Sequence, residues 1–135
     1  MKNFRKLSFL LALGILTSFY TLHAANDESN KTDVCRIDEF KITDKDGNAH
    51  LAIIMKEDIT HTGTITILLP PMSDAEKKQL KPEIKMHDPK SATISPASGV
   101  AHDFTKQASY TVDCTNKKGK KLTYKYKVDV GAAKE

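Results

Sequence analysis

Two runs of alternating residues near the end of the chain limit its possible folds more than any other feature. Their apolar side chains occupy every second position: Tyr110, Val112 and Cys114 in the first run, and Leu122, Tyr124, Tyr126, Val128 and Val130 in the second. A period of two predicts strands with one buried and one exposed face, whereas a helix would scatter these residues around its circumference. Residues 116–121 contain Gly119 and can reverse the chain. The region therefore predicts a β-hairpin.

Four lysines cluster at this predicted turn: Lys117, Lys118, Lys120 and Lys121. Such a cluster can bind anions or nucleic acid. The alternative is a solvated hairpin tip that also discourages edge pairing. The second reading is favoured because the chain shows neither a groove-reading helix nor stacking aromatics. We therefore expect no nucleic-acid partner.

Residues 1–25 have the features of a signal peptide. Basic residues open the segment, a mostly apolar run follows over 7–20, and Ala24 or Ala25 supplies the small residue before cleavage. The run is shorter than the roughly 20 residues of a permanent membrane span. No cysteine stands directly after the cleavage point. We expect an exported protein, periplasmic or extracellular, that is not lipid-anchored.

Removing this segment also removes most of the apparent basicity. It holds three of the 21 Lys and Arg residues and none of the 17 acids, which leaves 18 basic against 17 acidic residues. The balance gives no argument for an acidic partner. The remaining length suits one domain. We expect a flexible lead-in over 26–33, the domain over 34–131 and a tail over 132–135.

The two cysteines, Cys35 and Cys114, make an even count in an exported chain, which suggests one disulfide. In the loop-entropy model, closing so long a loop stabilises the fold by about 4 kcal/mol. Two free buried thiols are the alternative, because sequence spacing cannot show that the Cβ atoms meet. Two cysteines without histidines at ligand spacing do not make a metal site. We expect no cofactor.

Short strands separated by turn residues fill the rest of the domain. We expect them over 34–43, 49–56, 64–69, 81–86 and 91–95. Ser73 to Glu76 reads as a capping box, so a short helix over 75–80 should follow the 64–69 strand. About seven short strands and one small helix predict an all-β sandwich. The expected core consists of Phe40, Ile42, Ile53, Ile65, Ile67, Ile84, Ile94, Phe104, Tyr110, Val112, Tyr126, Val128 and Val130.

The segment 44–48 has features of a calcium loop. Asp44, Asp46 and Asn48 stand at alternate positions, as at the start of such a loop. However, glycine falls at the fourth place instead of the sixth, and Met55 stands where the loop needs glutamate. Asp-Gly is also a strong turn signal. A plain turn is the favoured reading.

The order of these segments resembles a bacterial immunoglobulin-like domain of unknown function, found in exported and surface proteins of gut Gram-negative anaerobes. The resemblance spans 37–130 and includes Ile65 to Pro70 followed by Ser73-Asp74, Ala92 to Gly99, Asp103-Phe104-Thr105, Tyr110-Thr111-Val112 and Tyr126 to Val130. It implies an immunoglobulin-like antiparallel β-sandwich and an envelope location, and brings no catalytic residues. Two positions depart from the family: it usually has alanine where Cys114 stands, and an Asp-Gly or similar turn at the lysine cluster.

The sequence gives little support for a catalytic function. His87-Asp88 and His102-Asp103 look like acid/base or metal pairs, but a site needs side chains that converge, and both pairs fall in predicted loops. No nucleophile elbow, zinc-protease or phosphate-loop motif occurs. We expect a protein that is not an enzyme.

Two binding roles remain. Sugars usually stack on exposed aromatic rings, and the alternation assigns nearly all rings to the core, unless Tyr124 or Tyr126 lies at an open sheet edge. A sandwich also offers edges and loops to protein partners, including by strand addition. The sequence favours a non-catalytic structural or protein-interaction module of the cell envelope. A glycan-binding accessory module of a polysaccharide-uptake system is the alternative.

Overall fold

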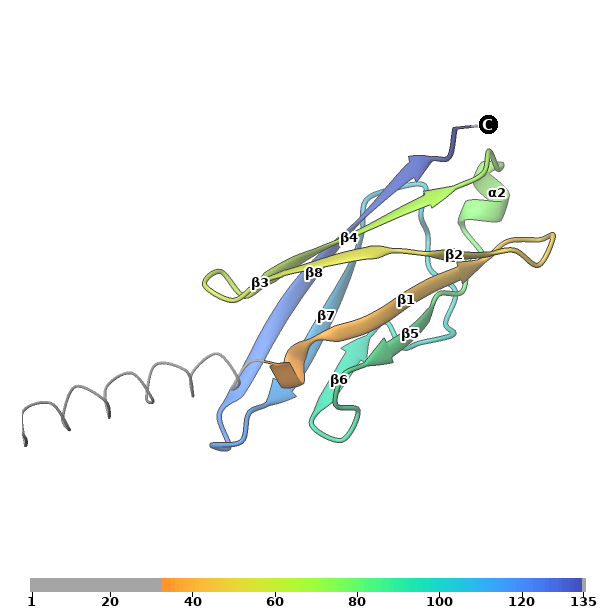
Figure 1. Ribbon diagram of the computed structural model, residues 1–135. Helices are drawn as coiled ribbons and strands as arrows, with labels where there is room; N and C mark the ends of the chain where they lie inside the picture. The colour runs from red at the N-terminus through yellow and green to blue at the C-terminus, as the bar shows by residue number, and fades with distance from the viewer. Residues whose placement is uncertain (1–32, 135) are drawn as a thin grey trace, which may run out of the picture. The chain divides into compact units, whose positions relative to one another are not determined.

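The computed structural model describes residues 33–134, and these form two facing β-sheets (Figure 1). The predicted signal peptide and nearly all of the predicted lead-in lie outside the described residues. In chain order the elements are η1 (Asp33–Cys35), β1 (Ile37–Thr43), β2 (Ala49–Leu51), β3 (Ile53–Glu57), β4 (Thr62–Leu69), α2 (Asp74–Lys77), β5 (Glu83–Met86), β6 (Ala92–Ser95), β7 (Ala108–Thr115) and β8 (Lys121–Ala132). Among the described residues, no helix has the length and apolar character needed to cross a bilayer.

One sheet has three strands in the order β2-β1-β5, and the other has five in the order β3-β4-β8-β7-β6. Neighbouring strands are antiparallel except β4 and β8, which run parallel with Ile65 beside Val128. The predicted hairpin is formed by β7 and β8, with Tyr110 opposite Tyr126. Gly119 in its turn has a φ of 79°, a conformation that suits glycine. The prediction of an all-β sandwich is confirmed.

The predicted strand over 49–56 is divided between the two sheets. β2 pairs with β1, whereas β3, only one residue later, pairs with β4. Between them, the N–H of Ala52 still donates to the carbonyl of Phe40 at 2.9 Å. The same stretch of chain thus closes one side of the sandwich, and residues 33–134 form eight strands where about seven were expected.

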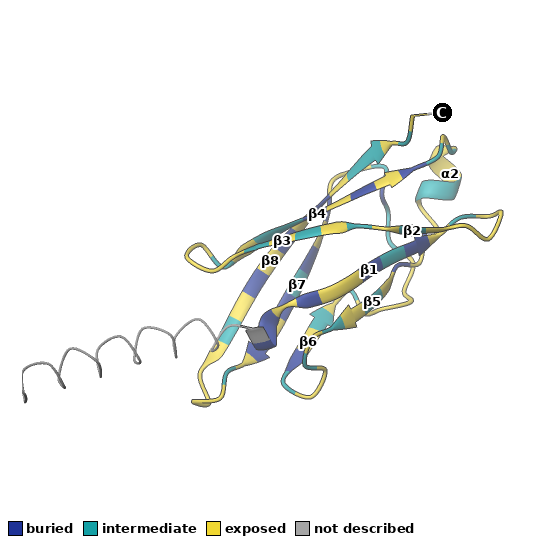
Figure 2. Ribbon diagram, viewed as in Figure 1, coloured by how far each residue is buried: buried dark blue, intermediate teal, exposed yellow. Residues whose placement is uncertain are grey.

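Buried residues from both sheets form one core, and their positions along the strands are dark blue in Figure 2. Phe40 on β1 and Tyr110 on β7 meet edge to face, with ring centroids 5.5 Å apart. Of the expected core, nine members are buried: Phe40, Ile42, Ile65, Ile67, Phe104, Tyr110, Val112, Tyr126 and Val128. Ile84, Ile94 and Val130 are partly buried against this core.

Ile53 was wrongly predicted to be buried. It is 70% exposed, and its neighbour Ile54 packs against the core instead. The run from Leu51 to Met55 is apolar at every position, so its pattern cannot show which alternate set faces inward. A shift of one residue exchanges the two faces of a strand completely.

The short helix and the first strand also have other bounds than expected. The capping box forms: the N–H of Ser73 donates to Glu76 Oε2 at 2.7 Å, and the N–H of Glu76 donates to Ser73 Oγ at 3.3 Å. The helix that follows has only four residues, because the carbonyl of Lys77 accepts from the loop residue Phe104 at 3.1 Å. The first strand starts at Ile37, since residues 33–35 form the 3-10 turn η1.

Candidate functional site

The structure does not join His87 to its sequence neighbour Asp88. His87 Nδ1 lies 3.1 Å from Asp38 Oδ2 and 2.8 Å from Arg36 Nη2. Asp88 instead accepts the N–H of Lys90 at 3.1 Å. Burial opposes ionisation of Asp38, but hydrogen bonds from His87 and Arg36 outweigh it and lower the pKa of this carboxyl. The group is an exposed polar cluster between β1 and β5.

His102 and Asp103 also take separate partners. The ring of His102 packs beside those of Tyr110 and Phe104, with centroids 5.3 and 5.6 Å away. Asp103 accepts from the hydroxyl and the N–H of Thr105, and these hydrogen bonds lower the pKa of its carboxyl. Neither predicted His–Asp pair therefore forms an acid/base unit.

The loop that resembles a calcium site is closed by its own donors. Asp44 Oδ1 accepts the N–H groups of Asp46 and Asn48 at 2.9 Å each, and Oδ2 lies 2.8 Å from His50 Nε2. The hydrogen bond to His50 leads the contacts that bring the pKa of Asp44 to about 2. With its oxygens occupied in this way, the segment forms a plain turn. Within residues 33–134, no group of three or more His, Cys, Asp or Glu side chains is placed to hold a metal ion.

Cys35 and Cys114 form a disulfide, with Cα atoms 5.4 Å apart. The bond joins η1 to β7 and thus connects the start of the domain to the five-stranded sheet. Beside it, the hydroxyl of Tyr126 donates to the carbonyl of Cys35 at 3.2 Å. Both cysteines are buried, so the bond fixes the core at this end.

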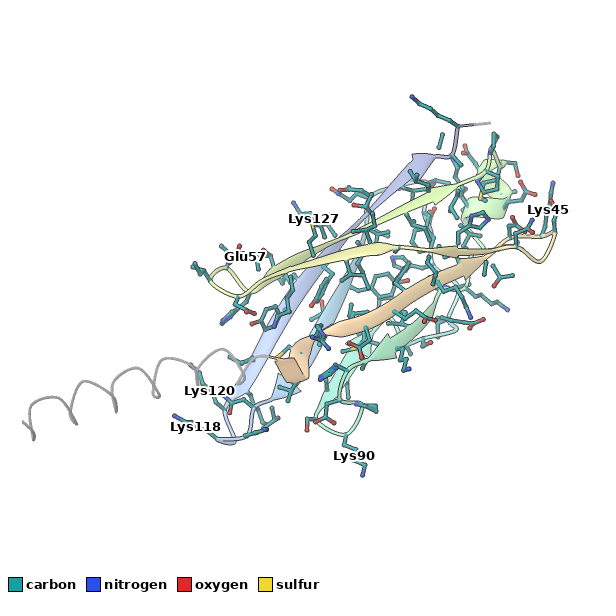
Figure 3. All side chains as sticks on the ribbon, in the orientation of Figure 1. Lys45, Glu57, Lys90, Lys118, Lys120 and Lys127 are labelled. Carbon is teal, nitrogen blue, oxygen red and sulfur yellow. A yellow bond between two sulfur atoms is a disulfide. The ribbon has the colours of Figure 1, made fainter. Side chains whose placement is uncertain are left out.

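The lysine cluster lies at the tip of the β7–β8 hairpin, where Lys118 and Lys120 extend away from the sheets (Figure 3). Asn116 organises the turn, because its Oδ1 accepts the N–H groups of Lys118 and Lys120 at 3.0 and 2.9 Å. Charged residues at such a tip keep it in water and hinder pairing with another strand.

All five Phe and Tyr rings of residues 33–134 belong to the core: Phe40, Phe104, Tyr110, Tyr124 and Tyr126. None of these rings is more than 5% exposed. Tyr124 could have offered a stacking surface at a sheet edge, but its hydroxyl donates to Asp58 at 2.9 Å and Lys56 Nζ lies 5.1 Å from its ring centroid. The described surface therefore presents no aromatic platform to a sugar.

What the surface does present is an apolar stripe of four side chains on the outer face of β2, β3 and β4. Its members, which we call the β3 stripe, are Leu51 (64% exposed), Ile53 (70%), Met55 (69%) and Leu68 (56%). Figure 2 shows the alternation of exposed and half-buried residues along β3. Contiguous exposed apolar patches of this kind mark interaction surfaces more often than isolated apolar residues do.

Sequence reasoning missed this stripe, although a signal was present. Five consecutive apolar residues, 51–55, exceed what one strand can direct into the core of a two-layered sandwich. One alternate set had to point outward. Polar neighbours border the stripe: Met55 pairs with Thr64, which lies beside Lys127, and Ile53 pairs with Thr66, which lies beside Asp129.

A second surface feature is a hollow of about 230 Å³ between the β1–β2 turn and the segment that carries α2. Pro70, Pro71 and Met72 give it apolar walls, and Asp44 and Glu76 line it with carboxylates. Glu76 is already engaged by Ser73 and by Lys45, whose Nζ lies 3.4 Å away. Hydrogen bonds from Ser73 lower the pKa of Glu76 and keep it ionised.

Two of the solved structures to which this chain is similar come from Bacteroides. A candidate glycoside hydrolase from Bacteroides thetaiotaomicron is 35% identical over 53% of this chain, with a TM-score of 0.41. This chain covers only 19% of that protein, about a fifth of its length. A candidate secreted protein from Bacteroides fragilis is 16% identical, with a TM-score of 0.45. The match covers 75% of this chain and 98% of that one. No curated protein sequence matches the chain.

The family comparison covers nearly all of the described domain. The family model for "SGBP, N-terminal", the N-terminal domain of starch/glycan-binding proteins, matches residues 37–130. This range begins at the first residue of β1 and ends inside β8, so it takes in both sheets. The chain belongs to the SGBP N-terminal domain family.

Proposed function

We propose that the domain is a non-catalytic module of the cell envelope that supports glycan handling through contact with protein. The observation that carries this proposal is the β3 stripe: four large apolar side chains stand exposed along β2, β3 and β4, whereas all Phe and Tyr rings of residues 33–134 are buried. Protein partners can cover such a surface, since apolar side chains dominate the centres of protein interfaces.

The chemistry of sugar binding favours a different surface. Sugars present apolar C–H faces to flat aromatic rings, and aliphatic side chains on a strand offer no comparable plane. Isoleucine, leucine and methionine instead interdigitate with other side chains, as they do in cores. The stripe is thus better suited to another protein than to a polysaccharide.

Export to the periplasm or the cell exterior is part of the proposal. It is supported by the composition of residues 1–25, by the disulfide and by the membership in a family of glycan-binding proteins. A role other than catalysis is supported by the separate placement of the His–Asp pairs. The immunoglobulin-like assignment of the sandwich stays a prediction.

Direct glycan binding is the second candidate, favoured by the hollow beside α2. Its proline and methionine walls could contact the C–H face of a sugar, and the carboxylate of Asp46, which also lines the hollow, could accept hydrogen bonds from hydroxyl groups. Affinity electrophoresis of the mature domain in soluble polysaccharides tests this role. Retardation that is lost in Met72→Ala would support it over protein contact.

The proposed protein contact can be tested in intact cells. A photoreactive amino acid in place of Met55 should give a discrete cross-linked product of the envelope fraction. The same amino acid in place of Lys85, which is exposed on the outer face of the other sheet, is the matched control. Equal labelling from the two positions, or none from either, would contradict the proposal.

A further inference from the structure

We infer that the partner of the β3 stripe is a second copy of this chain, packed outer face to outer face about a two-fold axis. The inference rests on the proposed function, because it names the protein that the stripe contacts. It starts from the contrast between the stripe and the outer face of β1 and β5. β1 and β5 expose charged residues, and their Lys41 and Glu83 form an ion pair at 2.8 Å. That face needs no cover, whereas the β3 stripe leaves apolar area in water.

Two adjacent rows of side chains across the larger sheet are complementary to each other. Strand register places the outward residues in rows across β3, β4 and β8. One row is Met55, Thr64 and Lys127, and the adjacent row is Ile53, Thr66 and Asp129. Each residue of one row therefore lies beside a residue of matching chemistry in the other row. An apolar residue lies beside an apolar one, threonine beside threonine, and a cation beside an anion.

A two-fold axis that runs across the strands, between these two rows, exchanges them between the copies. Met55 then lies on Ile53 of the second copy, and Lys127 lies opposite Asp129 of the second copy. Symmetry repeats both contacts, so a dimer has two apolar contacts and two pairs of opposite charge. Sheets pack face to face at about 10 Å, a distance that side chains from both sides fill.

The charges beside the stripe favour a second copy of this chain over an unrelated protein as the partner. β8 turns Lys125, Lys127 and Asp129 to this face, so a uniformly acidic or basic protein would meet a like charge there. The pair of Lys127 and Asp129 stands in the two rows described above. It matches a surface with the same two charges in reversed order, which the two-fold axis supplies. Complementary charges of this kind fix register and specificity more than they add affinity.

Sedimentation equilibrium of the mature protein tests the inference. The stripe is small for a stable interface, so we expect a reversible dimer with a Kd on the order of 10–100 μM. Met55→Lys should weaken association at least tenfold, because the symmetric interface would bury two uncompensated cations. Val100→Lys is the matched control: Val100 is 49% exposed and lies in a loop outside the stripe, and its replacement should leave the Kd unchanged.

Charge reversal tests the row exchange itself. Lys127→Glu alone and Asp129→Lys alone should each weaken the dimer about tenfold, since each places like charges opposite one another. The double variant restores opposite charges and should return the Kd to within about threefold of the wild type. Both residues are exposed, so circular dichroism should show the same folded state for all three variants.

The outcomes separate this inference from the proposed function. A single monomer mass at concentrations about tenfold above the expected Kd overturns the dimer. A dimer whose Kd does not change in Met55→Lys also overturns the inference. So does a double variant of Lys127 and Asp129 that dimerises as weakly as the two single variants. Cross-linking from Met55 to a different envelope protein in cells, together with a monomer in solution, would overturn the dimer and leave the protein-contact function standing.

Discussion

The ring of Tyr126 on β8 lies against the Cα of Gly63 on β4. The two residues are directly paired across the parallel strands, and a Cβ on Gly63 would overlap ring atoms Cδ1 and Cε1 of Tyr126. The same Cβ would also come within 2.8 Å of the backbone oxygen of Met55. Gly63 is therefore the position that lets a large buried ring fit between β3, β4 and β8.

Gly63→Ala should destabilise the fold by about 2 kcal/mol, the usual cost of forcing an extra methyl group into a packed site. Urea denaturation followed by circular dichroism measures this change. Gly131→Ala is the matched control, because its Cβ would overlap the flexible end of Leu68, at 2.7 Å, and would lie 4.0 Å from the backbone oxygen of Ile67, an ordinary contact distance. The control should cost less than about 1 kcal/mol. Equal losses would show that the Tyr126 ring does not constrain Gly63.

Removal of two buried tyrosine hydroxyls should have different effects on the free energy of unfolding. Tyr126 donates to the carbonyl of Cys35 at 3.2 Å, whereas the hydroxyl of Tyr110 has no hydrogen-bond partner among residues 33–134. Tyr126→Phe should cost about 1 kcal/mol of unfolding free energy, and Tyr110→Phe should be neutral or stabilising. Denaturation of the two variants side by side measures the difference. A larger loss for Tyr110→Phe would contradict the assignment.

The same two rings predict a loss of stability in alkali. Burial raises the pKa of Tyr110 and of Tyr126 to about 12, from 10 in the unfolded chain. Between pH 10 and 12 the unfolded state has lost these protons while the folded state keeps them, so the free energy of unfolding falls as the pH rises. Below pH 10 the contribution is fully present. Phenolate absorbance should rise near pH 10 in urea and only above it in the native protein.

The disulfide between Cys35 and Cys114 can be tested separately for its presence and for its effect. Mass spectrometry of envelope-derived protein should find no free thiol in the mature chain, and two alkylated thiols would refute the bond. The double variant Cys35→Ala/Cys114→Ala should lose about 4 kcal/mol, because the bond closes a loop with a sequence separation of 79.

The sequence indicates the parts of this fold whose faces differ in polarity. In β7 and β8 apolar and polar residues alternate, so the buried set could be identified before the structure. The capping box at Ser73 is also local, since its donors and acceptors lie within four residues. Neither signal depends on contacts with distant parts of the chain.

The features of the fold that the sequence could not show depend on contacts between distant segments. The parallel neighbour of β4 is β8, which lies about 60 residues later in the chain, and no local pattern specifies that pairing. His87 follows β5, and its partner Asp38 lies on the neighbouring strand β1, 49 residues earlier in the chain. The division of one stretch into β2 and β3 likewise depends on which sheet each half meets. The β3 stripe follows from that division, so it too was hidden.

Replacement of the two adjacent isoleucines in β3 tests which face of the strand is buried. Ile54 packs against the core, and Ile53 stands 70% exposed on the stripe. Ile54→Ala should destabilise the monomer by about 2 kcal/mol or more, because it removes buried methyl groups and leaves a gap. Ile53→Ala should change monomer stability by less than about 0.5 kcal/mol, as surface substitutions usually do. Denaturation at protein concentrations well below the expected Kd keeps association out of both measurements. If Ile53→Ala proved the more destabilising change, the strand would be shifted by one residue, the stripe would turn inward, and both protein contact and dimerisation would lose their basis.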